Sequence, residues 1–466
     1  MDSAAPAPAA APSWTPSARE RGDLELLLSG AYRPLTGFLG GADRAAVAAG
    51  GRLADGTPWP VAVTLELPAE LAGATEVTLT DPEGAPLARL EVAESNPTEV
   101  GRQLVSGPVT ALAASAYGAF RRLHRSPADV VAELAGAPTV AAVVDRPLHN
   151  REIADLRSAA GSREARILLL VTTGVAGSEP LIRAVIAAAE ELPEATVVAV
   201  PLPSPDGSLA RHLLGAHVAA AYGATHLLAD AELPGAPLPV VIASTPDGLT
   251  DDELAALLDA GAALPAGFTP PGVERELRRL RRPVSERGLV VLFTGYSGSG
   301  KSTLARALYD AVVERGDRTA TLLDGDVVRR MLSAGLGFSR ADRDLNVLRI
   351  GYVAAEVARH GGLAICAPIA PYAQTRAEVR AMAQAVGDFV LIWVSTSLAD
   401  CEARDRKGLY AQARAGTLTG FTGIDDPYDE PTDADLVIDT AGRPLSECLD
   451  EVVGRLVAGG WLPPRP

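Results

Sequence analysis

One segment of the sequence has the glycine and lysine spacing of a phosphate-binding loop. Gly295 to Ser302 reads GYSGSGKS and fits the pattern GxxxxGK[ST] in full. Glycines let successive backbone N–H groups turn toward one anion at the positive end of a following helix. Lys301 would reach the outer phosphates of a nucleoside triphosphate, and the Ser302 hydroxyl would bind Mg²⁺. The segment therefore predicts an ATP site.

The flanks of this segment supply the strand and helix that such a loop requires. The apolar run 289–294 (LVVLFT) predicts a buried strand, and 302–316 has helical spacing without interior Gly or Pro. A glycine-rich turn that binds nothing is the alternative interpretation. The Lys301-Ser302 pair and the two correct flanks favour the functional one.

Two carboxylates follow the next predicted strand, 319–323 (TATLL). Asp324 and Asp326 would lie at the carboxyl end of that strand, where ligands of open α/β sheets bind. One carboxylate can orient Mg²⁺ together with Ser302, and the other can accept a proton from an acceptor hydroxyl. A plain Asp-Gly-Asp turn is the alternative, and only its position after the loop favours chemistry. We predict Lys301, Asp324 and Asp326 as the catalytic residues, with Ser302 and Asp324 on the metal.

The bulk composition limits the partners and the compartment. The 466 residues carry a net charge of −16, which opposes general affinity for nucleic acid or an anionic membrane surface. Cys366, Cys401 and Cys448 show neither disulfide nor metal-ligand spacing. The N-terminal residues lack the basic and apolar regions of a secretory signal, and no apolar run is long enough to span a bilayer. We expect a cytoplasmic protein.

Composition and periodicity divide the chain into four parts. Residues 1–17 are rich in Ala and Pro and predict a flexible tail. Short strand-like runs and turns predict a β-rich domain over 18–137. Alternating apolar runs and helical patterns over 138–283 predict an α/β domain with a parallel sheet. A second α/β domain follows over 286–466, after a basic, Pro283-containing connector whose charges we assign to a solvated helix face.

Beyond the aspartates, one motif after another resembles the adenylyl-sulfate (APS) kinases. The matching segments are Leu323–Arg329, Leu336–Ser339, Asp342–Arg343, Asn346, Cys401–Glu402, Arg404–Asp405, Lys407–Tyr410, Ala413–Gly416, Phe421–Tyr428 and Val437–Thr440. The KGLY and FTGIDDPY segments are close to diagnostic. The resemblance implies a P-loop kinase fold and transfer of the γ-phosphate of ATP to the 3′-hydroxyl of APS, giving PAPS. It also leads us to expect a homo-oligomer, a dimer or higher.

The resemblance assigns roles to individual residues. For ATP they are Gly295, Ser297, Gly298, Ser299, Gly300, Lys301, Ser302, Thr303 and, near the adenine, Arg404. For APS they are Asp326, Arg329, Phe338, Arg343, Asn346, Lys407 and Phe421. Phe338 and Phe421 match the aromatic pair that sandwiches the adenine of APS in the family. Val327 and Ala370 stand where the family has Asn and Ser, so we expect altered kinetics rather than loss of activity.

Residues 22 to about 275 resemble ATP sulfurylase, the enzyme that makes APS, which implies a β-rich PUA-like domain and a Rossmann-like α/β domain. Its active-site motifs are degraded. Glu152 stands where the second histidine of HxxH would follow His149, and the segments 230–235 and 208–212 lack the matching GRDHAG and GPREA residues. An anion at Glu152 near phosphates would cost on the order of 1 to 4 kcal/mol. We interpret His149, His212 and His226 as surface or packing histidines.

Three hypotheses follow for the whole chain. The first is an APS kinase with an inactive sulfurylase-like region that serves as a scaffold, dimerisation element or nucleotide sensor. The second is a bifunctional sulfurylase and kinase that makes PAPS from sulfate and ATP. The third is a non-catalytic regulator that binds APS or PAPS, against which the intact Lys301, Ser302, Asp324 and Asp326 argue.

Overall fold

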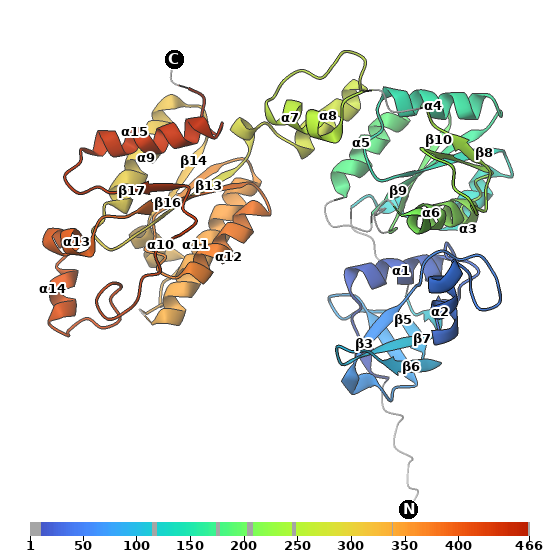
Figure 1. The fold of residues 1–466 in the computed structure, drawn as a ribbon, viewed down its shortest axis with the longest axis horizontal. Helices are drawn as coiled ribbons and strands as arrows, with labels where there is room; N and C mark the ends of the chain where they lie inside the picture. Colours follow the sequence, from blue (N-terminus) through green and yellow to red (C-terminus); the bar gives the residue numbers. More distant parts are fainter. Residues whose placement is uncertain are drawn as a thin grey trace, which may run out of the picture. The chain divides into compact units, whose positions relative to one another are not determined.

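The computed structural model describes residues 11–113, 119–173, 178–202, 208–244, 248–337 and 339–464. The side chains of Asp326, Val327 and Arg329 also lie outside the description. The chain divides into two compact units (Figure 1). Unit 1 comprises the residues up to Ala255 together with Ala263–Arg281, and unit 2 comprises Ala256–Ala262 together with the residues from Arg282 onward. None of the described helices is long and apolar enough to cross a bilayer.

Unit 1 begins with a β-rich part. Its elements are β1 (Ser13–Trp14), α1 (Ala18–Ser29), β2 (Gly37–Phe38), α2 (Gly41–Gly50), β3 (Leu65–Pro68), β4 (Glu76–Thr80), β5 (Pro86–Glu91), β6 (Glu94–Pro97) and β7 (Arg102–Ala111). β7 is the central strand and pairs antiparallel with β2, β3, β5 and β6. Helix α1 begins at a capping box, in which Ser17 and Glu20 satisfy each other's backbone N–H groups.

The predicted flexible tail, 1–17, is wrong for its last residues. Ser13 and Trp14 form β1, which pairs with β4, and Ser17 is the N-cap of α1. The physical reason is Trp14, whose ring packs against the core of unit 1 and lies 5.3 Å from the guanidinium of Arg102. The Ala/Pro composition concealed this anchor. Residues 1–10 lie outside the described part of the chain.

The second part of unit 1 is a parallel α/β layer. Its elements are α3 (Pro127–Leu134), β8 (Thr139–Val144), α4 (Asn150–Gly161), β9 (Arg166–Thr172), α5 (Glu179–Ala189), β10 (Ala195–Val200), α6 (Leu209–Ala221), β11 (His226–Ala229), β12 (Val240–Ile242), the first half of α7 (Asp251–Asp259) and α8 (Pro271–Leu280). The residues of α7 from Ala256 onward belong to unit 2. The strand order is β10-β9-β8-β11-β12, so the direction of winding reverses between β8 and β11. The sequence predicted this parallel layer, and the structure confirms it.

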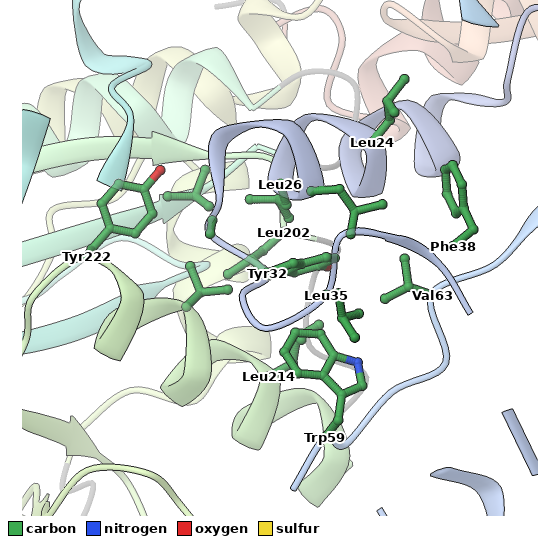
Figure 2. Packing of buried hydrophobic residues seen from close by; sticks show 14 of the residues in the cluster. Leu24, Leu26, Tyr32, Leu35, Phe38, Trp59, Val63, Leu202, Leu214 and Tyr222 are labelled. Atoms are coloured by element: carbon green, nitrogen blue, oxygen red, sulfur yellow. The ribbon is translucent and has the colours of Figure 1, made fainter. Parts of the chain in front are cut away.

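One hydrophobic cluster joins the two parts of unit 1 (Figure 2). The β-rich part contributes Leu26, Tyr32 and Trp59, and the α/β part contributes Leu214 and Tyr222. All five side chains are at most 2% exposed. The two N-terminal domains proposed from the sequence therefore share a single core.

Unit 2 contains a five-stranded parallel sheet with a core on each face. Its elements are β13 (Leu289–Thr294), α9 (Lys301–Arg315), β14 (Ala320–Leu323), α10 (Gly325–Met331), α11 (Arg340–Arg359), β15 (Leu363–Cys366), α12 (Ala373–Gln384), β16 (Asp388–Val394), α13 (Leu398–Arg404), α14 (Leu409–Arg414), β17 (Leu436–Ile438) and α15 (Leu445–Ala458). The strand order is β14-β15-β13-β16-β17. Helices α9 and α15 contribute to the core on one face, and α11 and α12 to that on the other (Figure 1). This arrangement confirms the predicted α/β class with a P-loop kinase fold.

Candidate active site

The glycine-rich loop lies where the sequence predicts, between β13 and α9. The strand lies between β15 and β16 in the sheet, and all of its residues are buried. The loop follows the last residue of this strand and therefore lies at the carboxyl edge of the sheet. Gly295, Gly298 and Gly300 have φ values of 143°, 78° and 101°, which side chains other than glycine rarely adopt. A Cβ on Gly295 would stand 2.4 Å from the carbonyl oxygen of Val394. The close approach of β16 therefore requires glycine there.

The loop borders a cavity of about 560 Å³. Predicted residues that line it are Ser297, Gly298, Gly300, Lys301, Ser302, Thr303, Asp324, Arg343, Asn346, Lys407 and Phe421. They come from segments far apart in the sequence: the loop and α9, the end of β14, helix α11, and the segment around α14. The structure thus brings most of the predicted ATP and APS residues to one cavity.

Lys301 is held inside the loop by backbone and hydroxyl oxygens. Its side chain is 6% exposed, and its Nζ donates to the carbonyl oxygen of Tyr296 at 2.6 Å and lies 3.5 Å from the Ser299 hydroxyl. Burial lowers the pKa of Lys301 to about 8, and the Asp324 carboxylate opposes this shift. A phosphate in the cavity would favour the charged form of this lysine.

Helix α11 directs two buried polar groups toward the cavity. The side-chain oxygen of Asn346 is buried and has no hydrogen-bond partner within the described protein. Such an acceptor is costly unless a ligand or water satisfies it. Arg343, one turn earlier, is 9% exposed and donates to the Thr422 hydroxyl at 2.9 Å and to Asp426 at 2.6 Å. The hydroxyl of Tyr372 donates to the other oxygen of Asp426 at 2.8 Å.

Residues of the segment from Asp405 to Thr422 form a wall of the cavity. The Tyr410 hydroxyl donates to the carbonyl oxygen of Ser297 at 2.8 Å, and its ring meets Phe421 edge-on with centroids 4.9 Å apart. Phe421 therefore has a fixed position beside the loop. Asp405 accepts from the backbone N–H groups of Tyr410 and Ala411, both in the first turn of α14.

Some predicted residues do not line the cavity. Arg404 donates to the carbonyl oxygen of Gly298 and to Thr440, so it ties the loop to the end of β17, and its placement near an adenine stays a prediction. Gly295 and Ser299 lie in the loop but do not line the cavity. Asp326 and Arg329 have described backbones in α10 only, and Phe338 lies outside the described residues. Their predicted roles stay predictions.

Sequence reasoning assigned no site role to several residues that line the cavity, among them Arg406, Tyr410 and Leu409. Tyr410 and Leu409 stood in the KGLY segment that carried the resemblance, so their position was the available signal. Arg406 is exposed and borders the same wall as Lys407. The only signal for Arg406 in the sequence was its positive charge close to Arg404 and Lys407.

Ala370 adopts an unusual backbone conformation beside the loop. Its φ is +46°, in the left-handed region, although it is not glycine. Buried groups fix this turn: its carbonyl oxygen accepts from the hydroxyl of Thr294 at 3.1 Å and from Arg376 at 2.8 Å. The side chain is 1% exposed. Alanine stands here in place of the family's serine, but the turn is still held by hydrogen bonds to the backbone carbonyl of Ala370.

A second cavity, of about 540 Å³, lies in unit 1 and gathers the three segments that the sequence analysis compared with sulfurylase motifs. Glu152, His212 and Asp230, one from each segment, all line it. His149 does not; its ring packs on Phe268 with centroids 4.2 Å apart. The Glu152 carboxylate accepts from the backbone N–H of His149. Burial raises its pKa, but hydrogen bonds from the backbone and Arg151 and the charge of Arg146 outweigh burial and lower it.

Comparisons with known proteins found similar proteins for both units. Residues 287–439 match the adenylylsulphate kinase family, and residues 2–104 match the PUA-like domain family. A sulfate adenylyltransferase from Emericella nidulans is 30% identical over 540 aligned residues, which cover 97% of this chain and 94% of that protein. A sulfate adenylyltransferase from Chaetomium globosum is 42% identical over 214 residues, and the match spans only 37% of that protein's length. Among solved structures, a hexameric APS kinase from Thiobacillus denitrificans has a TM-score of 0.84 and 33% identity, with 97% of this chain and 94% of that chain covered.

Proposed function

Since the chain belongs to the sulfate adenylyltransferase family and carries an adenylylsulphate kinase domain, we propose that unit 2 transfers the γ-phosphate of ATP to the 3′-hydroxyl of APS. The observation that carries this proposal is the single cavity shared by the phosphate-binding loop, Asp324 and the unsatisfied oxygen of Asn346. A buried acceptor without a partner, beside cationic groups, supports a polar and anionic ligand.

In the proposed reaction the 3′-oxygen of APS forms a bond to the γ-phosphorus, and the bond from that phosphorus to the bridging oxygen of ADP breaks. The hydroxyl proton passes to a carboxylate, for which Asp326 remains our candidate and Asp324 the alternative. Lys301 neutralises charge on the transferred group and becomes fully protonated when the anion arrives. Arg343, oriented by Asp426, would hold the acceptor nucleotide.

The residues at the loop fit a magnesium ion that travels with ATP. The Ser302 hydroxyl and the Asp324 carboxylate line the same cavity. The described residues contain no group of three or more His, Cys, Asp or Glu that could hold a metal by themselves. That donor set suits Mg²⁺, which binds through one or two protein oxygens plus phosphates and water. When bound, the ion would neutralise phosphate charge.

The test is ADP release by the purified full chain with ATP and APS. We expect turnover that depends on both substrates and a loss of roughly 10²-fold or more in Lys301→Ala, because that lysine acts on developing phosphate charge. Activity in Lys301→Ala within twofold of the parent would remove this mechanism. Asp324→Asn and Asp326→Asn divide the metal and proton roles: the proton acceptor's variant should lose turnover while it keeps its affinity for APS.

We propose further that unit 1 has the sulfurylase scaffold without sulfurylase turnover. The support is the charge of its cavity, where Glu152 and Asp230 take the contacts of Arg146 that a substrate anion would need. The full-length sulfate adenylyltransferase relatives keep the bifunctional alternative open. Sulfate-dependent pyrophosphate release that survives Lys301→Ala and disappears in His149→Ala would establish that alternative.

We also propose that the chain forms a homo-oligomer. Support comes from the Thiobacillus denitrificans APS kinase, which is hexameric and aligns with nearly the whole chain. Light scattering on the purified protein, coupled to size-exclusion chromatography, should give a mass that is a multiple of 48.1 kDa. A monomer at micromolar concentration would contradict the proposal.

A further inference from the structure

The cavity of unit 1 lies at the point where the winding of its parallel sheet reverses, between β8 and β11. Asp145 and Asp230 directly follow β8 and β11, the two strands that flank the reversal, and both line the cavity. In open parallel sheets, ligands bind outside the carboxyl ends of the strands at this point. The cavity floor consists of apolar residues from the same strands, such as Val143 and Leu228. Position and volume are therefore those of a ligand site.

Two arginines are already engaged by carboxylates of the chain: Arg146, which lines the cavity, and Arg151, which contacts the lining residue Glu152. Arg146 lies 3.4 Å from Glu152 through one terminal nitrogen and 3.1 Å from Asp230 through the other. Arg151 lies 3.2 Å from the same oxygen of Glu152. The second oxygen of Glu152 accepts the backbone N–H of His149 at 3.1 Å. One carboxylate thus receives two guanidinium groups and a backbone donor.

This set of donors is the kind that binds a phosphate or sulfate oxygen. Two arginines and a backbone N–H that converge on one point recognise oxyanions by short, charge-assisted hydrogen bonds. Here the point of convergence is a side chain that is 9% exposed at the cavity wall. The carboxylate has the charge and the acceptor oxygens of the missing anion.

We propose that unit 1 retains an oxyanion site formed by Arg146, Arg151 and the backbone of His149, and that Glu152 occupies it as an internal ligand. The ligand class of the site is a phosphate-type oxyanion such as diphosphate. The parent chain excludes that anion because the carboxylate neutralises both arginines. This inference concerns unit 1 alone and does not depend on the kinase activity proposed for unit 2.

The test is isothermal titration of the full-length chain with inorganic pyrophosphate. All variants carry Lys301→Ala, so that binding at the phosphate loop of unit 2 is weakened equally in each. Glu152→Gln keeps the size of the side chain and an acceptor for the His149 N–H but removes the charge. We expect it to bind pyrophosphate at least about tenfold more tightly than the Lys301→Ala parent, and Arg146→Ala added to it should reverse the gain.

Glu276→Gln is the matched control. Glu276 is also buried in unit 1, at 7% exposed, and is also bound by two arginines, Arg183 at 2.7 Å and Arg279 at 2.6 Å, but it lines neither cavity. It should leave pyrophosphate affinity unchanged. An equal gain in the control, no gain in Glu152→Gln, or a gain that survives Arg146→Ala would each overturn the proposal.

A second variant guards against misfolding of Glu152→Gln. Asp230 is exposed, with 64% of its side chain accessible, so Asp230→Asn removes the other carboxylate on Arg146 without disturbing the core. Because an exposed ion pair is weak, we expect a gain of about twofold to fivefold in pyrophosphate affinity. Unchanged affinity in a folded Asp230→Asn chain would count against the site.

Discussion

Replacing Lys301 by methionine should stabilise the ligand-free protein while it removes kinase activity. The side chain is 6% exposed, and burial lowers its pKa from 10.5 to about 8. That difference corresponds to about 3 kcal/mol of unfavourable free energy at neutral pH, since one pKa unit is 1.36 kcal/mol. Methionine fills a similar volume without a charge. The lost hydrogen bond to Tyr296 costs about 1 kcal/mol, so the net gain is about 2 kcal/mol.

The sign of the pH dependence separates this cause from a packing effect. Below pH 8 both folded and unfolded chains carry the charged lysine, and the folded parent bears the whole penalty. Between pH 8 and 10.5 the folded parent loses this proton while the unfolded chain keeps it, so the parent becomes more stable relative to the variant as pH rises. The advantage of Lys301→Met should therefore shrink from pH 7 to about 9.5.

Differential scanning calorimetry measures the effect. For a unit of this size, 2 kcal/mol shifts the melting temperature by about 4 to 8 °C. Lys301→Arg, which keeps a buried charge, serves as the control and should show no gain. A Lys301→Met chain that melts below the parent at pH 7, or an advantage that does not change with pH, would refute the reasoning.

Three further predictions concern the same cavity. Asp426→Asn removes the carboxylate 2.6 Å from the nearly buried Arg343, so denaturant titration should show a loss of about 3 kcal/mol and the kcat/KM for APS should fall at least about tenfold. Asn346→Ala removes a buried oxygen that has no described protein partner; stability should change by less than about 1 kcal/mol, whereas the KM for APS should rise several-fold, and an unchanged KM contradicts its role. Gly295→Ala places a Cβ 2.4 Å from a backbone oxygen and should abolish ATP binding in equilibrium dialysis, whereas Gly316→Ala, which meets nothing within 4 Å, should bind ATP normally.

The sequence predicted the parts of the fold that depend on local pattern. The runs 139–144 and 289–294 are continuous apolar stretches, and both are strands buried in parallel sheets. The phosphate loop was equally predictable because its glycines and Lys301 lie close together in the sequence and form one continuous motif. Local pattern was sufficient for these elements because a short, continuous apolar run is typical of a strand that is buried on both faces of a parallel sheet.

Contacts between distant residues were not predictable in the same way. Arg404 matched a family position, yet its bonds to Gly298 and Thr440 join segments far apart in the chain. The anchoring of Trp14 in the first sheet depended on strand pairing across more than sixty positions. Glu152 was recognised as an anion, but nothing in one sequence indicated that its partner Arg146 would also meet Asp230, 84 positions away in the chain. Such contacts follow from tertiary packing.

The shared core of unit 1 determines how that unit unfolds. Leu26, Tyr32 and Trp59 from the β-rich part and Leu214 and Tyr222 from the α/β part belong to one buried cluster (Figure 2). Neither sheet can lose its partner without exposing a large apolar face to water. Cooperativity in proteins extends as far as a continuous core does. The two sheets, which differ in strand direction and in sequence pattern, therefore unfold as one body, and a fragment cut between them would be left with half a core.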